Sequence, residues 1–273
     1  MEAILTDEYF ELFRTLIYDQ SGIHFSETNR SILESRLKER LKIARLDTLQ
    51  EYFGSIKHNQ EEMKILLDSV TTNLTRFFRN APHFETFVNF VIPKVIERKR
   101  RDDDRRLRLW SAGCSTGEEP YSVAMVMRDK APPGFQIEVI GSDLSLKSLM
   151  VANEGFYAEA RVADVPAAYL SRYFDRKRDG YQVRKEIKDL IKFDYHNLKN
   201  DSGPRNLDIV FCRNVFIYFD GAAQKAVIDR FWHAMSDYSY LFIGHSESLF
   251  GMKTEFEFVK TDWATLYRKN ISR

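Results

Sequence analysis

The sequence predicts an α/β protein in which a small all-helical unit precedes a mainly parallel sheet with an antiparallel edge. In the first eighty residues apolar side chains recur at helical spacing, and no Val/Ile-rich alternating stretch appears. From residue 107 onward, strand-like and helix-like segments alternate, which is typical of a parallel sheet. Two late strand-like segments, 255–259 and 264–267, are separated by a short link and indicate a terminal hairpin.

Four helices are expected in the first unit. The first follows a cap at Thr6 and stops at Ser21-Gly22. The second spans about 29–44, and shorter helices lie near 48–56 and 61–69. We therefore place a helical domain with its linker at 1–80 and a second domain at 81–273.

The second domain is expected to alternate strands and helices. Strands are predicted at 107–112, 136–141, 207–212 and 240–244, and helices at 119–128, 145–152 and 221–235. The mixed-charge run 98–108 should end a helix and form an exposed turn. Alternation around Asp179-Gly180 predicts a small antiparallel subdomain inserted at about 171–194.

Composition excludes several classes of protein. Of 273 residues, 44% are hydrophobic and 30% charged, which fits a globular protein. The net charge of +1 argues against general polyanion binding, and no apolar run approaches the ~20 residues of a membrane span. The N-terminus does not resemble a secretory signal. Two cysteines, Cys114 and Cys212, form no disulfide framework or metal cluster, so we expect a cytoplasmic protein and no metal.

Small residues and two carboxylates follow the first predicted strand. Gly113 and its neighbours allow the backbone to approach a ligand closely. Glu118 and Glu119 at the next helix start would repel a pyrophosphate and favour a cationic group, although they could also simply balance the helix dipole. The sequence does not show which of the two glutamates would bind the cationic group of a ligand. We prefer Glu118 because it directly follows the turn.

Two further strand ends carry polar side chains. Asp143 is suited to ribose hydroxyls, or alternatively to capping a helix. The polar pair Arg213-Asn214 directly follows another strand. This pair could belong to a binding site or simply form a turn. Together with the acidic pair, these residues favour a nucleoside with a cationic, amine-bearing tail. S-adenosylmethionine (SAM) has that chemistry, whereas nicotinamide and flavin dinucleotides carry a disfavoured diphosphate.

Five ordered motifs resemble those of the chemotaxis receptor glutamate methyltransferases, the CheR family. They are TTNLTRFFR (71–79), WSAGCSTGEEPYS (110–122), GSDLS (141–145), RNVFIYF (213–219) and GHSESL (244–249). The resemblance covers essentially the whole chain. It implies a class I SAM-dependent methyltransferase that forms methyl esters on glutamates of chemoreceptors for adaptation, with S-adenosylhomocysteine (SAH) as product.

The resemblance also implies roles for individual residues. The cofactor-binding set is Asn73, Thr75, Arg79, Gly113, Glu118, Asp143, Asn197, Leu198, Arg213 and Asn214. Within it, Glu118 would hold the methionine amine, Asp143 the ribose, and Asn197-Leu198 the adenine. Tyr218 would lie beside the reactive methyl group, with Tyr218 and Arg79 as the candidate catalytic, orienting residues.

The second helix of the first unit is basic, although residues 1–80 as a whole are slightly acidic. On composition alone this helix could simply be solvated. The resemblance implies that it docks on the acidic signalling helices of chemoreceptors, through Arg36, Arg40 and Lys42. The loop 174–183 is short and has a single glycine, so we expect no tether to a receptor's C-terminal peptide.

Two other functions compete with this interpretation. A nucleic-acid methyltransferase would fit the cationic helix, but the overall charge is neutral and no Asn/Asp-Pro-Pro-aromatic segment follows the strand before Arg213. A non-catalytic, cofactor-sensing adaptor is the second alternative, and the intact site residues argue against it. A glutamate acceptor is already ionised at neutral pH, so no general base is required, and we expect the six histidines to be structural.

Overall fold

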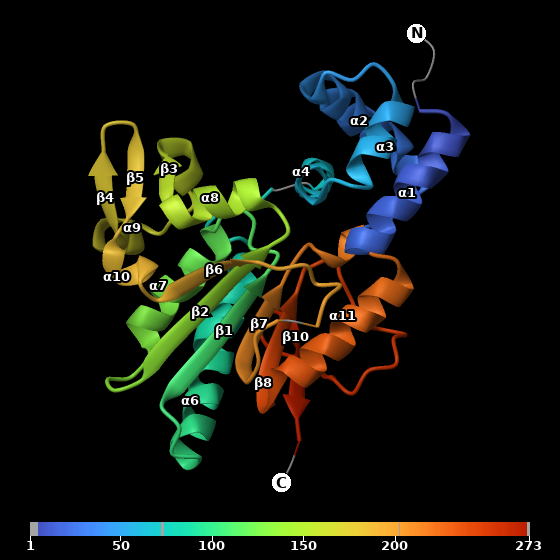
Figure 1. Cartoon of the computed structure of the whole chain (residues 1–273). Helices are drawn as coiled ribbons and strands as arrows, with labels where there is room; N and C mark the ends of the chain where they lie inside the picture. Colours follow the sequence, from blue (N-terminus) through green and yellow to red (C-terminus); the bar gives the residue numbers. More distant parts are fainter. Residues whose placement is uncertain (1–4, 72–73, 202, 272–273) are drawn as a thin grey trace.

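The computed structural model describes residues 5–71, 74–201 and 203–271 (Figure 1). The helical unit contains α1 (Asp7–Ser21), α2 (Arg30–Ala44), α3 (Leu49–Ile56) and α4 (Gln60–Val70), with a short 3-10 turn at Glu27–Asn29. Thr6 caps α1 by accepting the Tyr9 N–H, and Gly22 ends it in the left-handed conformation. The four predicted helices are confirmed.

The main sheet has seven strands in the order β6-β2-β1-β7-β8-β10-β9. They are β1 (Arg106–Ala112), β2 (Gln136–Asp143), β6 (Ile191–Tyr195), β7 (Leu207–Cys212), β8 (Met235–Ile243), β9 (Glu257–Lys260) and β10 (Thr265–Asn270). The first five in that order run parallel, and β9 and β10 form an antiparallel edge. This confirms the predicted fold class. The strand expected at 240–244 begins earlier, because Met235 already pairs with Leu207.

Helices cover both faces of this sheet. They are α5 (Ala81–Thr86), α6 (Ile92–Arg101), α7 (Glu118–Lys130), α8 (Leu146–Glu154) and α11 (Gly221–Ala234), with a π-helical turn at Phe87–Val91 between α5 and α6. Strand β7 shows the division: Phe211 packs into the core of α6 and α7, whereas Val210 packs into the core of α11. As predicted, the charged run 98–108 ends α6 and forms an exposed turn that leads into β1. Its opposite charges pair with one another, for example Arg98 with Asp102.

The inserted subdomain is larger at its start and shorter at its end than predicted. A three-stranded antiparallel sheet joins β3 (Phe156–Ala158), β5 (Gly180–Val183) and β4 (Phe174–Lys177), accompanied by α9 (Ala167–Tyr173), α10 (Lys185–Lys188) and a 3-10 turn at Glu159–Val162. The predicted limits 171–194 are therefore wrong at both ends. Tyr157 pairs with Tyr181, which brings β3 into the small sheet, while Phe193 pairs with Gly141 and makes β6 the main sheet's edge.

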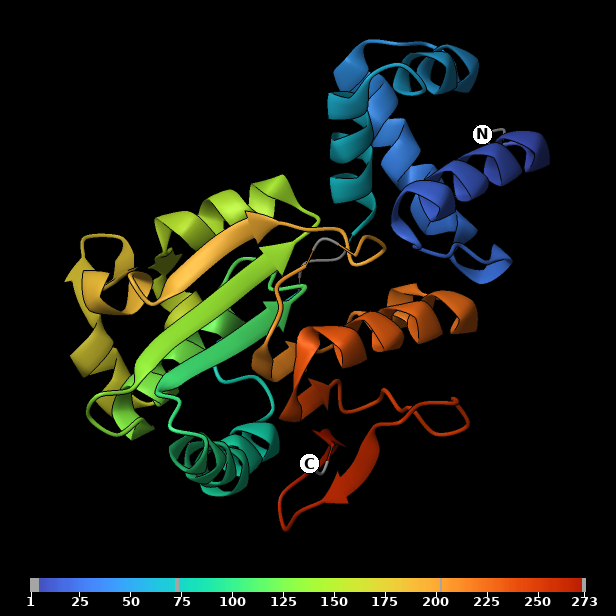
Figure 2. The same cartoon turned by 60° about the horizontal axis from the view of Figure 1, so that its bottom comes forward.

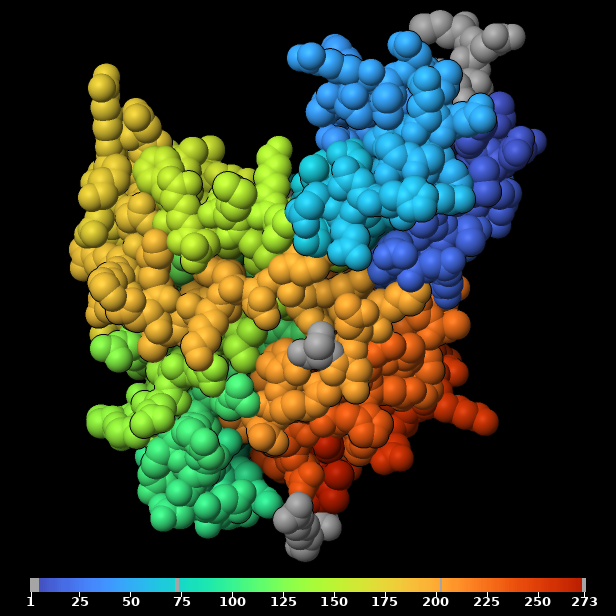
Figure 3. All heavy atoms as spheres, viewed as in Figure 1, coloured from blue at the N-terminus to red at the C-terminus, as the bar shows by residue number. Residues whose placement is uncertain are grey.

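The helical unit lies over the carboxyl ends of the parallel strands (Figure 2), and Figure 3 shows it resting directly on the rest of the chain. Ile23 forms a β-bridge with Phe219, and the Tyr218 carbonyl accepts the His24 N–H at 2.8 Å. The Tyr18 hydroxyl donates to Asp220 at 3.1 Å. Among the helices in the described ranges, none is long and apolar enough to cross a bilayer.

Candidate active site

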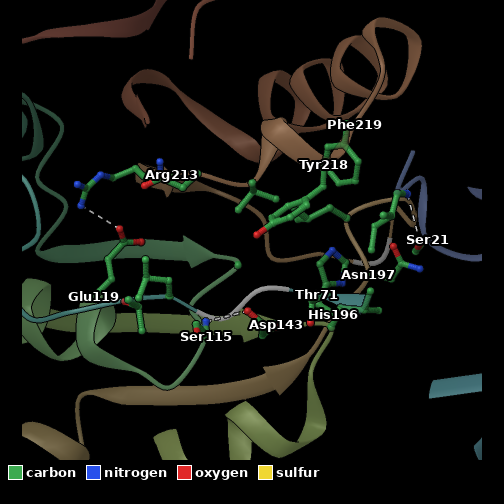
Figure 4. Close-up of a pocket in the computed structure, with 18 of the residues that line it drawn as sticks. Ser21, Thr71, Ser115, Glu119, Asp143, His196, Asn197, Arg213, Tyr218 and Phe219 are labelled. Atoms are coloured by element: carbon green, nitrogen blue, oxygen red, sulfur yellow. Dashed lines mark hydrogen bonds and ion pairs between the residues drawn. The ribbon is translucent and has the colours of Figure 1, made fainter. Parts of the chain in front are cut away.

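A pocket that is partly open to solvent lies where β1, β2 and β7 end beneath the helical unit. Its wall contains nine of the predicted cofactor and catalytic residues: Thr75, Arg79, Gly113, Asp143, Asn197, Leu198, Arg213, Asn214 and Tyr218. Figure 4 shows Asp143, Arg213 and Tyr218 around the same cavity. Glu118 is not on this wall, and Asn73 lies outside the described residues. Most of the residues predicted for cofactor binding and catalysis therefore lie on the wall of one continuous pocket.

Other wall residues were not predicted. They are Ser21, Ile23, Thr71, Leu74, Ser115, Leu144, His196, Val215 and Phe219. Ser21 and Ile23 reach the pocket only because the end of α1 docks against Phe219. No local pattern reports that contact. His196, by contrast, directly follows β6, and recognising β6 as a strand of the main sheet would have pointed to it.

The turn after β1 requires a glycine at position 113. Gly113 has a φ of +80°, and a Cβ there would lie 2.5 Å from Val215 Cγ2. Its N–H donates to the Ser142 carbonyl at 2.8 Å, which ties the turn to β2. Glycine is thus required both by the backbone conformation and by the close approach of the segment after β7.

Asp143 ends β2 with both carboxylate oxygens oriented by backbone. Oδ2 accepts the Ser115 N–H at 2.7 Å, and Oδ1 accepts the Ser145 N–H at 2.8 Å. Burial raises the pKa of Asp143, while these N–H groups oppose the rise. Asp143 therefore lines the pocket, whereas helix α8 is capped by Ser145, whose side chain accepts the Ser148 N–H; the ribose role of Asp143 stays a prediction. A fixed buried carboxylate is a suitable acceptor for ligand hydroxyls.

The two glutamates at the start of α7 face different partners. Glu119 lines the pocket, where it accepts from Ser111 Oγ at 2.7 Å and from Arg213 Nη1 at 3.1 Å. Glu118 is fully buried and accepts from Thr116 and Arg161. We preferred Glu118 as the residue that binds the methionine amine, but only Glu119 lines the pocket, so the position of the two side chains does not support that preference.

Arg213 contacts both the first turn of α7 and the linker that follows α4. Its Nη2 donates to the Arg79 carbonyl at 2.6 Å, in addition to the Glu119 pair shown as a dashed line in Figure 4. Burial lowers the pKa of Arg213, and the neighbouring Glu119 carboxylate opposes that effect. The Arg79 side chain itself donates to the Leu74 carbonyl at 2.8 Å. The linker after α4 is thereby fixed against the end of β7.

The segment after β7 presents Asn214 and Tyr218 to the cavity. Asn214 has a φ of +61°, which is uncommon outside glycine. A 3-10 turn, Phe216–Tyr218, follows, and Tyr218 extends into the cavity in Figure 4. The Asn197 side chain, on the opposite wall, donates to the Gln20 carbonyl at 2.7 Å. The helical unit therefore contacts both walls.

Helix α2 shows a clear departure from the predicted docking surface. Arg40 is buried and pairs with Glu62, with Nη2 at 2.7 Å from Oε1, and Tyr52 donates to the same carboxylate. Arg40 therefore packs inside the helical unit, and the expectation that it contacts a receptor is corrected. Lys42 is exposed, and Arg36, with 39% of its side chain exposed, lies 3.8 Å from Glu39.

The donor and acceptor groups of the pocket fit SAM. Gly113 brings a residue without a side chain to the pocket wall, Asp143 offers carboxylate oxygens, and Glu119 on the wall supplies negative charge. A strand-end pocket with these features suits a nucleoside bearing a cationic tail.

Comparisons with known proteins cover nearly the whole chain. The family model described as "CheR methyltransferase, all-alpha domain" matches residues 8–71, and "CheR methyltransferase, SAM binding domain" matches 73–265. The chain is 33% identical over 258 residues to the chemotaxis protein methyltransferase of Borreliella burgdorferi, covering 92% of this chain and 91% of that one. Identity is 35% to the Salmonella typhimurium chemotaxis protein methyltransferase and 34% to that of Escherichia coli, each over 92% of this chain and 88% of the relative.

Proposed function

This chain belongs to the CheR family of chemotaxis protein methyltransferases, and on that basis we propose how its own residues carry out the reaction. It is a protein-glutamate O-methyltransferase that uses SAM to methylate glutamate side chains of chemoreceptors. The roles of individual residues given below are proposals, each supported by a contact or a wall position described above.

The reaction is a displacement at carbon. SAM, when bound, supplies a methyl group on a sulfonium; a glutamate oxygen forms the new bond while the carbon–sulfur pair stays on sulfur. The products are a methyl ester and SAH. The acceptor carboxyl has an unperturbed pKa of ~4.3 and is already ionised at neutral pH, so the protein supplies orientation and shields the reactants from water.

The strand-end residues are proposed to hold the cofactor. Asp143 receives the ribose hydroxyls, Gly113 gives the backbone access, and Asn197 with Leu198 borders the adenine; all four lie on the wall. The amine is assigned to the acidic pair. Glu119 is already balanced by buried Arg213, whereas the partner of Glu118, Arg161, is 45% exposed and can turn to water. We therefore assign the amine to Glu118, with a direct test below.

Tyr218 and Arg79 are proposed to orient the reactants. Both line the pocket, and each is anchored to another element: the Tyr218 carbonyl to His24, and the Arg79 side chain to the Leu74 carbonyl. Thr75, Arg213 and Asn214 complete the enclosure around them. Alignment of carboxylate, methyl and sulfur is the main contribution expected from this arrangement.

Receptor docking is proposed for α2, within a division of the chain into a docking domain with linker (1–80) and a transferase domain (81–273). Arg36 and Lys42 remain in this docking set, supported by their exposed positions and by the basic character of the helix. The proposed partner is the acidic signalling helix of a chemoreceptor, and we propose neither binding to nucleic acid nor direct insertion into a membrane. We place this activity in the cytoplasm, in line with two free, buried thiols.

We propose that no C-terminal receptor peptide tethers this enzyme. The hairpin of β4 and β5 closes with two residues, Arg178 and Asp179, between the paired Lys177 and Gly180. So short a turn offers little surface to a peptide. Titration with a receptor-tail peptide should show no binding, and micromolar binding would overturn this proposal.

The observation that carries the function is the single pocket that combines strand-end residues of the sheet with the linker of the helical unit. The experiment is a radiolabelled methyl-transfer assay with three arms: chemoreceptor, RNA and no acceptor. Base-labile label should appear only with the receptor. Label on RNA would favour a nucleic-acid methyltransferase, and label in no arm would favour a non-catalytic adaptor.

A further inference from the structure

The motif at 244–249 follows β8, yet none of its side chains lines the cofactor pocket. Strands β7 and β8 are parallel neighbours, with Cys212 paired to Ile243, so the segments after both strands emerge side by side. The segment after β7 carries Asn214 and Tyr218. The turn 244–247 therefore lies against the part of the site that faces the reacting atoms.

The Glu247 carboxylate reaches into that neighbouring segment. Its Oε2 accepts the Asn214 N–H at 3.0 Å and the Gly244 N–H at 2.5 Å. Burial raises the pKa of Glu247, while the N–H groups of Gly244, Asn214, Phe216 and Ile217 oppose the rise. One carboxylate thus faces backbone donors along most of the segment between Arg213 and Tyr218.

The backbone that Glu247 holds is conformationally demanding. Asn214 adopts a positive φ, and the 3-10 turn that begins at Phe216 starts with N–H groups that have no carbonyl of their own turn to bind. The Glu247 carboxylate accepts the Asn214 N–H directly, and its negative charge lies close enough to the N–H groups of Phe216 and Ile217 to favour the turn. Without it, the positions of Asn214 and Tyr218 would be poorly defined.

Gly244 makes room for this contact. A Cβ on Gly244 would lie 2.5 Å from Glu247 Oε2 and 2.9 Å from the Asn214 nitrogen. The glycine is required here by the close approach of the carboxylate to the β7 segment. Gly244 and Glu247, at the two ends of the turn, are therefore both needed for the contact between the carboxylate and the Asn214 N–H.

From these contacts we propose that Glu247 is a positioning residue for methyl transfer: it fixes the segment 213–218 so that Tyr218 and Asn214 meet the reactants in one arrangement. It touches neither cofactor nor acceptor in this account. The proposal rests on the function proposed above, and specifically on the role given to Tyr218.

The test compares Glu247→Gln with Glu255→Gln, which replaces an exposed glutamate of the loop between β8 and β9. The glutamine keeps the shape of the side chain and one acceptor oxygen, but it removes the negative charge and places an NH2 group where the second carboxylate oxygen lies. We expect Glu247→Gln to lower kcat at saturating SAM and receptor at least tenfold, with SAH affinity changed less than threefold. Glu255→Gln should behave as wild type.

A double-mutant cycle with Tyr218→Phe separates positioning from a general structural role. If Glu247 acts through Tyr218, Glu247→Gln should lower kcat less than twofold further in the Tyr218→Phe background. Equal losses in both backgrounds, or a kcat loss that only follows the folded fraction, would overturn the proposal. A wild-type rate for Glu247→Gln would also overturn it.

Two provisions keep the result interpretable. If Glu247→Gln folds poorly, Gly244→Ala retains the carboxylate but pushes it from the segment, and it should give the same loss of kcat. If Tyr218→Phe alone keeps the wild-type rate, the proposal that Glu247 acts through Tyr218 is overturned, whereas methyl transfer by that variant shows that the proposed function itself stands.

Discussion

Arg213 Nη1 donates to Glu119 Oε2 across 3.1 Å and joins the end of β7 to the first turn of α7 at the pocket wall. The two side chains are 3% and 13% exposed. Removing one partner of a buried ion pair leaves the other charge uncompensated and typically costs about 3–5 kcal/mol. Loss of either partner should therefore destabilise the pocket, which distinguishes Glu119 from Glu118.

Glutamine variants of the two glutamates should lose different properties. Glu119→Gln leaves Arg213 buried without a counter-ion, so its melting temperature should fall. Glu118→Gln should melt near the wild type, because Arg161 can rehydrate, but should bind SAM at least tenfold more weakly. Calorimetry and thermal unfolding on both variants make the comparison. Normal SAM affinity in Glu118→Gln together with weakened affinity in a fully stable Glu119→Gln would reassign the amine to Glu119.

Gly113→Ala should damage the pocket from within. The alanine Cβ would collide with Val215, and its positive φ adds strain of about 1 kcal/mol or more. We expect a lower melting temperature and at least tenfold weaker SAH binding. In Gly113→Ala/Val215→Ala the collision is relieved, so part of the loss should be recovered. An equal loss in the double variant would mean that the approach of Val215 does not set this requirement.

Tyr218→Phe should affect turnover more than affinity. The hydroxyl is assigned to orientation of the reactants, so kcat should fall at least tenfold while SAH affinity stays within about threefold. Steady-state methylation assays and calorimetry provide the two numbers. Tyr181→Phe, in the small sheet, is the matched control and should retain both. A wild-type kcat in Tyr218→Phe would remove this residue from the mechanism.

Charge reversal on α2 should weaken receptor methylation without affecting the cofactor. Arg36→Glu/Lys42→Glu should raise the receptor KM at least fivefold, most strongly at low salt, and leave SAH affinity unchanged. Lys185→Glu/Lys188→Glu on α10 serves as the control for net charge. A loss of SAH affinity parallel to the loss of methylation would contradict the docking assignment.

Arg40→Ala belongs to the same experiment as a contrast. This variant removes the buried partner of Glu62, so the free energy of unfolding should fall by about 3–5 kcal/mol and the melting temperature should fall with it. Docking on the receptor should not be affected. Folded Arg40→Ala should methylate receptor with an ordinary KM. A raised KM at unchanged stability would return Arg40 to the docking set.

His83 should make the fold sensitive to acid. Burial, then the positive charges of Arg213 and His245, lower the pKa of His83 to about 3. The unfolded chain therefore binds more protons below pH 6.5, and this residue's stabilisation is lost as pH falls, by about 1.4 kcal/mol per pH unit. In His83→Phe the free energy of unfolding should fall less steeply between pH 6.5 and 5. The exposed His58→Phe should keep the wild-type slope, and an unchanged slope in His83→Phe would contradict the prediction.

Periodicity and strand-end chemistry predicted most of the architecture, because these signals are local. Apolar spacing located the helices of the first unit, and small or polar residues after strands located Gly113, Asp143 and Asn214. Apolar and polar residues alternate from Ile191 to Tyr195, so the sequence placed most of this strand in the inserted antiparallel subdomain. Its assignment to the main sheet as β6 depends on pairing with β2. Long-range pairing of this kind leaves no mark within a short window of sequence.

Arg40 shows the corresponding limit for the site. Arg40 lies at the border of the apolar stripe of its helix, where a long side chain can either extend into water or pack against the core. The choice is made by Glu62 and Tyr52, which approach from other helices. Ser21 and Ile23 likewise enter the pocket only through the docking of two domains. Contacts between elements, rather than residue type, decide these positions.

The most direct test of the account is calorimetric titration of the full chain with SAH. The titration should show heat from a single SAH site per chain, because one pocket combines the strand ends with the linker. Absence of heat with SAH and with SAM would contradict the assignment of this pocket.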